Sequence, residues 1–122
     1  MRPNIIMAAT AAAVLSVPLD AQAREFFLVK DRSEFIELIE GRDLTRFGVR
    51  LNVTPDGQIT GSAFGFTVTG TWDWQGNYFC RDMSYGSGNA LGYNCQTVYR
   101  DGDMLRFIAD RGDGDHADLR LR

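Results

Sequence analysis

The chain has 122 residues, of which 24% are charged and 44% hydrophobic, and its formal net charge at neutral pH is −3. A small negative charge excludes the electrostatic attraction on which nucleic-acid binding depends, so we expect no nucleic-acid partner. The length is sufficient for one domain of modest stability.

The first 23 residues are predicted to be a secretory signal peptide. Arg2 precedes an apolar run from Ile5 to Val17, and a triplet of the small-x-small type ends at Ala23. The run is shorter than the roughly 20 residues that span a bilayer. We therefore expect cleavage after Ala23, a periplasmic or secreted location without a membrane span, and a single β-rich domain over residues 24–122.

The two cysteines, Cys80 and Cys95, are predicted to form a disulfide because exported compartments are oxidising. A loop of this size contributes roughly 3 kcal/mol in the chain-entropy account. The cysteines and the single histidine, His116, fall short of a four-ligand zinc site. The aspartates between Asp110 and Asp118 do not follow the EF-hand pattern either. We expect no metal site and no catalytic residue.

The first elements after the signal are short. The apolar run within residues 24–30 is either a strand or a docking arm. Residues 32–40 are predicted to form an amphipathic helix, capped by Asp31 or Ser33, with Glu34 at the capping-box spacing from Asp31. The apolar positions recur at helical spacing at Phe35, Ile36, Leu38 and Ile39.

From Phe47 onward the pattern changes to alternation, with turn signals about every ten residues, which is typical of an antiparallel meander. We expect a mainly β fold, a strongly curved sheet of six or seven strands that forms a small barrel or half-barrel with the helix closing it. A β-sandwich is the alternative. The predicted strands are 47–53, 58–64, 66–74, 78–84, 92–100, 103–109 and 115–121.

The Asp101-Gly102 dipeptide predicts the register of one hairpin. As the two residues of a type I′ loop, it sets Val98 opposite Leu105. Strand alternation then separates a core face from a face that mixes rings with polar atoms. The core face is predicted to hold Phe79, Val98, Leu105, Phe107 and Ala109, and the other face Tyr78, Cys80, Tyr93, Cys95, Thr97, Tyr99, Arg106 and Ile108.

A direct pairing of Cys80 with Cys95 predicts the register of the preceding hairpin. It centres the loop on Ser87-Gly88. This centre lies within residues 85–89, the most turn-like stretch of the chain. The composition of the turn and the pairing of the cysteines therefore agree on one alignment.

The face that the two tryptophans occupy stays open. Trp72 and Trp74 are two residues apart, so they share one face of a strand. A change of one residue in the turn at Gln75 would move both rings to the other face.

Rings and guanidinium groups together favour apolar or anionic ligands. The aromatic face therefore predicts a ligand surface made by Tyr78, Tyr93 and Tyr99 with Arg106 and Arg81. Plain packing of the rings is the alternative. The glycine-rich stretches 57–61 and 86–92 contain no G-x-G-x-x-G that leads into a helix, so we expect no nucleotide cofactor.

Four segments carry a family resemblance: Gly70–Trp74, Tyr78–Asp82, Leu91–Gln96 and Arg111-Gly112. They resemble a family of short exported bacterial proteins, over nearly the whole chain after the signal. Members often bear the label dihydrodipicolinate reductase, an enzyme of lysine synthesis that uses a nicotinamide cofactor. The resemblance supports the disulfide framework, and its label implies an NAD(P)H-dependent reduction.

We expect a monomeric periplasmic binding or interaction module that is not a catalyst. Its partner is predicted to be an envelope protein or a small ligand. Two alternatives remain: the reductase of the family label, and an inhibitor of envelope or host hydrolases, by analogy with other small disulfide-linked β folds.

Overall fold

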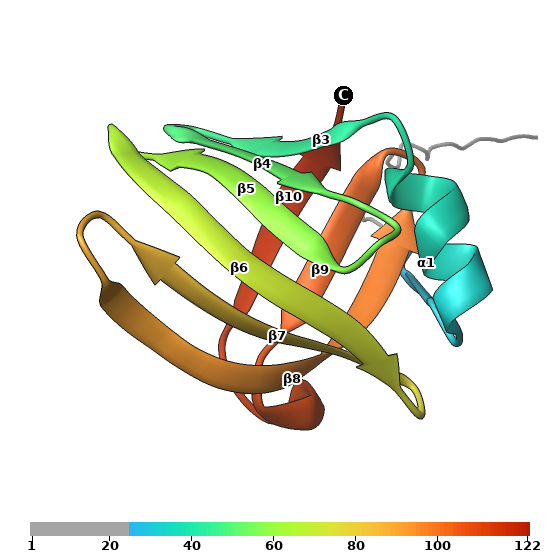
Figure 1. The fold of residues 1–122 in the computed structure, drawn as a ribbon. Helices are drawn as coiled ribbons and strands as arrows, with labels where there is room; N and C mark the ends of the chain where they lie inside the picture. The colour runs from blue at the N-terminus through green and yellow to red at the C-terminus, as the bar shows by residue number, and fades with distance from the viewer. Residues whose placement is uncertain (1–24) are drawn as a thin grey trace, which may run out of the picture.

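The computed structural model describes residues 25–122, which form a closed antiparallel β-barrel with a helix at one end (Figure 1). The predicted β-barrel is confirmed, and the β-sandwich alternative is wrong. The predicted signal peptide, residues 1–23, lies outside the described residues.

The barrel wall consists of the strands β3 to β10, which follow one another around it in chain order. β10 pairs with β3 and closes the wall, and β2 pairs with the second half of β8 as an additional strand. The elements are β2 (Phe27–Leu28), α1 (Arg32–Ile39), β3 (Asp43–Arg46), β4 (Val49–Val53), β5 (Gln58–Ala63), β6 (Phe66–Gln75), β7 (Tyr78–Tyr85), β8 (Asn89–Asp101), β9 (Met104–Ile108), a 3₁₀ turn η1 (Asp110–Gly112) and β10 (His116–Leu121).

The predicted helix is confirmed as α1, and it closes one end of the barrel. Asp31 is the N-cap, and its Oδ1 accepts a hydrogen bond of 2.9 Å from the backbone N–H of Glu34. The Arg32 guanidinium donates to the carbonyl oxygen of Pro55, in the turn between β4 and β5, at 2.7 Å. The buried face of the helix, with Phe35 and Ile39, points into the barrel.

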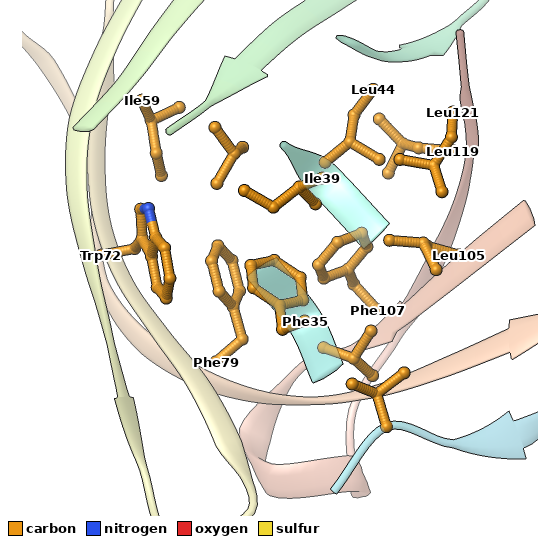
Figure 2. Packing of buried hydrophobic residues seen from close by; sticks show 13 residues of the cluster. Phe35, Ile39, Leu44, Ile59, Trp72, Phe79, Leu105, Phe107, Leu119 and Leu121 are labelled. Atoms are coloured by element: carbon orange, nitrogen blue, oxygen red, sulfur yellow. The ribbon is translucent and has the colours of Figure 1, made fainter. Parts of the chain in front are cut away.

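The Phe35 ring is the centre of an aromatic cluster inside the barrel (Figure 2). Its centroid lies 5.2 Å from those of both Trp72 and Trp74. It also lies 5.0 Å from Phe79 and 6.4 Å from Phe107. Both tryptophans therefore face the interior, which answers the question that the sequence left open. The rings bury a large apolar area in tilted and edge-to-face arrangements, which stabilise the closed end.

Aliphatic side chains surround the aromatic cluster and complete the core (Figure 2). They come from α1, from the segment after β2 and from most strands of the wall, so one core holds the barrel together. The buried core residues are Val29, Phe35, Ile39, Leu44, Val53, Ile59, Trp72, Phe79, Val98, Leu105, Phe107, Leu119 and Leu121.

The predicted register between β8 and β9 is wrong by two residues. The loop is Gly102-Asp103 rather than Asp101-Gly102, and Val98 therefore lies opposite Phe107 rather than opposite Leu105. A shift of two residues keeps every side chain on its predicted face. The assignment of Val98, Leu105 and Phe107 to the core is accordingly confirmed.

The position of Asp103 in the loop has a physical cause. Its carboxylate accepts a hydrogen bond of 2.9 Å from the Arg42 guanidinium, just before β3. Its carbonyl oxygen accepts another, of 2.7 Å, from the backbone N–H of Leu121. Gly102 also suits the first position of this loop, because its φ of 58° is the positive value that a type II′ turn requires there.

The predicted register between β7 and β8 is confirmed at the cysteines. Cys80 lies directly opposite Cys95, and the two are joined by a disulfide. The register then shifts by one residue between Met83 and Ser84, which is a β-bulge. Because of this bulge the loop consists of residues 86–88 rather than the two central residues that were predicted.

Strand β3 was missed by the sequence analysis. The predicted strand 47–53 is in fact β4, preceded by a turn at Phe47-Gly48 and by β3. β3 has only four residues, and Leu44 alone is buried among them. A single buried side chain gives no alternation to detect. The omission matters because β3 is the strand that pairs with β10 to close the wall.

Strong curvature of the wall depends on Gly61 in β5. Its φ of 150° lies in a region that L-residues rarely adopt, and a Cβ there would lie 2.1 Å from the carbonyl oxygen of Arg50 on β4. A residue with a side chain would push these two strands apart. Glycine therefore allows the close approach at which the sheet bends.

Candidate functional site

A cavity of about 230 Å³ lies inside the barrel, beyond the aromatic cluster. Phe79 and Phe107 belong both to the core and to the cavity wall, so the cluster around Phe35 forms its floor. The lining residues come from inward positions of the strands: Leu44, Arg46, Val49, Leu51, Val53, Ile59, Phe79, Arg81, Met83, Gln96, Phe107, Ala117 and Leu119.

Two glycines lie on the inward face beside the cavity. Alternation along β5 and β6 places Gly61 on the same face as Ile59, and Gly70 on the same face as Trp72. An added Cβ would meet the neighbouring strand, at 2.1 Å from the carbonyl oxygen of Arg50 for Gly61 and at 2.5 Å from that of Asp82 for Gly70. Both glycines therefore allow adjacent strands of the wall to approach closely.

A second, wider hollow of about 360 Å³ continues from the first toward the end of the barrel opposite α1. The two spaces share Val49, Leu51 and Met83 in their walls. The outer space lies in the size range of small-molecule sites, about 300–1,000 Å³. Its lining is apolar except for one hydroxyl group and consists of Val49, Leu51, Ala63, Phe64, Phe66, Val68, Met83, Tyr85 and Leu91.

Arg81 is the most enclosed charged group of the inner cavity. It follows Phe79 at the next inward position of β7 and is half-buried. Its guanidinium donates a hydrogen bond of 2.7 Å to the carbonyl oxygen of Gly92. Burial lowers the pKa of Arg81 from its ordinary value, and the nearby charge of Asp82 opposes part of that shift. The group remains a cation at any physiological pH.

Arg46, the last residue of β3, borders the cavity but is exposed. Among the described residues, neither Arg46 nor Arg81 has a carboxylate within salt-bridge distance. Gln96 is the third polar residue of the wall. An apolar space with one enclosed cation and an amide suits a ligand that combines a hydrocarbon portion with a negative group.

The structure does not bring the predicted ligand residues together. Arg81 faces the cavity, whereas Tyr78, Tyr93, Tyr99 and Arg106 lie on the outer face of the wall. The sequence pattern contained the relevant signal, because Arg81 alternates with the core residue Phe79. The cavity residues Arg46, Met83 and Gln96 were missed, since nothing local distinguishes them from wall residues.

The charge of Arg106 is already paired with a carboxylate on the neighbouring strand, β10. Its Nε and one terminal nitrogen donate to the two carboxylate oxygens of Asp118, at 2.8 and 3.0 Å. The hydrogen bond to Asp118 raises the pKa of Arg106 above its ordinary value. The Phe26 ring lies over the guanidinium, 4.2 Å from centroid to Cζ. The group is therefore covered on one face and ion-paired at its edge.

Tyr93 covers the disulfide on the outer wall. Its hydroxyl oxygen lies 3.6 Å from Sγ of Cys95 and accepts a hydrogen bond of 2.9 Å from the side chain of Gln75. Both cysteines are buried beneath it. A shallow hollow beside the ring is bordered by the carboxylates of Asp73 and Asp82. These contacts account for Tyr93 without a ligand.

Residues 25–122 show neither a membrane-spanning helix nor a cluster of metal-binding side chains. No helix in residues 25–122 is long and apolar enough to cross a membrane. The same residues contain no group of three or more histidine, cysteine, aspartate or glutamate side chains placed to hold a metal ion.

Comparisons with protein-family models, with curated proteins and with solved structures found no match.

Proposed function

We propose that this chain is an exported binding module that holds a small amphipathic anion inside its barrel. The apolar part of the ligand lies in the outer space, and its negative group lies in the inner cavity near Arg81. The single observation that carries the proposal is Arg81, a half-buried cation without a carboxylate partner among the described residues, in a wall that is otherwise almost entirely apolar.

The orientation follows from where the charges lie. The half-buried guanidinium of Arg81 belongs to the inner cavity and Arg46 is exposed at its border, whereas the outer space is apolar except for the hydroxyl of Tyr85. An anionic group gains charge-assisted hydrogen bonds only at the inner level. In the outer space, a hydrocarbon chain displaces water from the apolar walls, which is favourable. The negative end therefore points toward the aromatic floor.

Export is part of the same proposal. A disulfide is stable in oxidising compartments and rare in the cytosol, and Cys80 and Cys95 form one. The apolar run from Ile5 to Val17 and the small-x-small triplet that ends at Ala23 support the same location. Mass spectrometry of the protein from its native cells tests this, and a chain with residues 1–23 still attached would contradict it.

Calorimetric titration with dodecanoate, compared with the uncharged dodecanol, tests the site. The chain that begins at Arg24 contains the entire barrel and is used throughout. We expect Arg81→Met to weaken dodecanoate binding by at least about tenfold, because one charge-assisted hydrogen bond is worth about 1.5–3 kcal/mol. Dodecanol binding should stay unchanged. Met83→Trp, which fills the passage between the two spaces, should abolish the binding of both compounds.

Arg106→Met is the matched control on the outer wall. It removes a guanidinium of the same kind but leaves the cavity unaltered, so dodecanoate affinity should not change. If Arg106→Met weakens binding and Arg81→Met does not, the ligand lies on the outer tyrosine face and the interior site is wrong. Circular dichroism of each variant shows that the barrel is retained.

The family resemblance offers a competing activity, reduction with a nicotinamide cofactor. A titration of the protein with NADPH, followed by cofactor fluorescence, tests it. A saturable signal that survives Met83→Trp would favour a reductase with a site outside the barrel. We expect no saturable signal, because the outer space is lined by apolar groups and a single hydroxyl and offers a dinucleotide few polar partners.

A further inference from the structure

Large apolar side chains stand exposed around the open end of the barrel, opposite α1. The exposed fractions are 91% for Phe47, 67% for Phe64, 51% for Phe66 and 50% for Leu91. They come from the β3–β4 turn, from the β5–β6 turn and from the start of β8, whose tips lie together on the left of Figure 1. We call these four residues the mouth rim. Clustered exposure of this kind marks a surface that meets another apolar phase.

Contacts between the tips hold the mouth rim in one arrangement. The backbone N–H of Phe64 donates to the carbonyl oxygen of Gly48 at 2.7 Å, which joins the first two tips. The rings of Phe66 and Tyr85 meet edge to face with centroids 5.7 Å apart. The rim is thus a preformed platform and loses little conformational freedom when it docks.

Phe64 occupies a position that folding alone would give to another residue. It has a φ of 50° and is followed by Gly65 with a φ of 86°, so both loop residues of this hairpin are left-handed. Such a type I′ loop favours asparagine and glycine, and an aromatic side chain there is strained. The ring covers Gly48, where an added Cβ would lie 2.5 Å from it, but it stays 67% exposed. Most of the ring is therefore available to a surface outside the molecule.

The three tips that carry the mouth rim have charge of one sign, whereas the fourth turn at this end of the barrel, residues 109–115, contains three aspartates and one arginine. The segments 46–50, 63–67 and 85–92 contain Arg46 and Arg50 but no aspartate or glutamate, in a chain whose net charge is −3. Arg50 is paired with Asp43, whereas Arg46, next to Phe47, has no carboxylate partner among the described residues. Apolar rings beside an unpaired cation complement a surface whose outermost layer is negatively charged and whose interior is apolar.

We propose that the mouth rim inserts into the surface of an anionic lipid layer, with the mouth of the barrel facing the lipid. Phenylalanine and leucine side chains enter the boundary between headgroups and acyl chains, and Arg46 contacts the negative headgroups. This inference builds on the proposed function, because a layer of amphipathic anions is then the source of the ligand. The outer space, lined by Phe64, Phe66 and Leu91 of the rim, opens directly onto that layer.

Vesicle co-sedimentation tests the rim. The probes are vesicles of phosphatidylglycerol with phosphatidylcholine, and vesicles of phosphatidylcholine alone. The chain begins at Arg24 in every sample, because an apolar leader would bind lipid by itself. We expect partition onto the anionic vesicles, with about a tenfold loss for each of Phe47→Ser and Phe64→Asn. Arg46→Gln should reduce partition onto the anionic vesicles only.

Two substitutions elsewhere are matched controls. Phe27→Ser and Tyr93→Ser remove rings that are 62% and 58% exposed, but they lie on β2 and on the outer wall, away from the mouth. Both should leave partition unchanged. If exposed rings are attracted to lipid wherever they lie, the control variants would lose vesicle partition as much as the rim variants do. That result would overturn the proposal.

The stability of Phe64→Asn separates a surface role from a folding role. Because asparagine suits the left-handed position, this variant should unfold at a higher temperature while it loses lipid binding. If it loses both stability and binding, Phe64 serves the fold and the proposal fails. Dimers in analytical ultracentrifugation that Phe47→Ser dissolves, without vesicle binding by the parent chain, would likewise overturn it in favour of a second copy as the partner.

Lipid contact at the mouth rim and ligand binding in the cavity can be refuted separately. Dodecanoate binding that depends on Arg81, without partition onto vesicles, would overturn the rim and leave the cavity in place. Partition that depends on Phe47 and Phe64, without dodecanoate binding, would retain the rim and remove the proposed ligand.

Discussion

Arg81 and Arg106 project from opposite faces of the barrel wall, although both were assigned to one ligand surface from the sequence. Arg106 is bound by both carboxylate oxygens of Asp118, and Arg81 has a single carbonyl partner, Gly92, at the edge of an apolar cavity. The difference decides where an anion is attracted. A cation that is already paired offers little to a ligand, whereas an enclosed cation with a single neutral partner offers much.

Phe35→Ala is expected to destabilise the barrel by about 3–5 kcal/mol, because it removes the ring around which the aromatic cluster is packed. Urea unfolding followed by tryptophan fluorescence measures the loss. Phe27→Ala is the control, since Phe27 is mostly exposed and its removal should change stability by no more than about 0.5 kcal/mol. Equal losses in the two variants would show that the cluster is not the centre of stability.

Replacing both cysteines with serine is expected to lower stability by about 3 kcal/mol, as the entropy of a loop with a sequence separation of 15 residues implies. The barrel itself should persist, because the ladder between β7 and β8 continues from Cys80 and Cys95 as far as Tyr85 and Asn89. Chemical denaturation gives the loss, and far-ultraviolet circular dichroism shows whether the strands remain. An unfolded double variant would mean that the ladder depends on the disulfide.

Gly61→Ala is expected to cost at least about 3 kcal/mol, because the added Cβ would lie 2.1 Å from a carbonyl oxygen of β4. Gly76→Ala is the comparison. Gly76 also has a positive φ, 61°, but nothing lies within 4 Å of the added Cβ, so the cost should be only about 1 kcal/mol. Thermal melts of the two variants give the difference, and similar melting temperatures would refute the close approach at Gly61.

Phe64→Asn is expected to stabilise the chain by about 1 kcal/mol, since asparagine tolerates the left-handed backbone that strains phenylalanine. Phe47→Asn is the reference for the loss of an exposed ring, because Phe47 is not among the residues with positive φ, and it should leave stability nearly unchanged. Differential scanning calorimetry compares them. A stability loss in Phe64→Asn would show that the ring supports the hairpin.

Local signals in the sequence predicted the elements whose causes are local. Asp31 and Glu34 fix the start of the helix through their own hydrogen bond, and Pro55 with Gly57 produces the turn that was expected. The direct pairing of the cysteines also predicted one alignment correctly, because a covalent bond fixes it regardless of the rest of the fold.

Long-range contacts explain what the sequence could not predict. The loop at Gly102-Asp103 is set by Arg42 and Leu121, which are remote in the chain. The cavity likewise depends on which inward positions lack a filling partner across the barrel. Arg81 alternates with Phe79 and thus carried a signal for the interior, but Arg46 lies in the strand that alternation did not reveal.

The pairing of β10 with β3 sets the order in which this barrel is able to form. Every other ladder of the barrel wall joins strands that follow each other along the chain, so each grows as a hairpin from its own turn. The β3–β10 ladder joins Leu44 to Leu121 and has to wait for the last strand. Loop closure over that separation is slow and entropically unfavourable. Without β10 the wall would be an open curved sheet whose two edge strands, β3 and β9, present unpaired backbone groups to other chains.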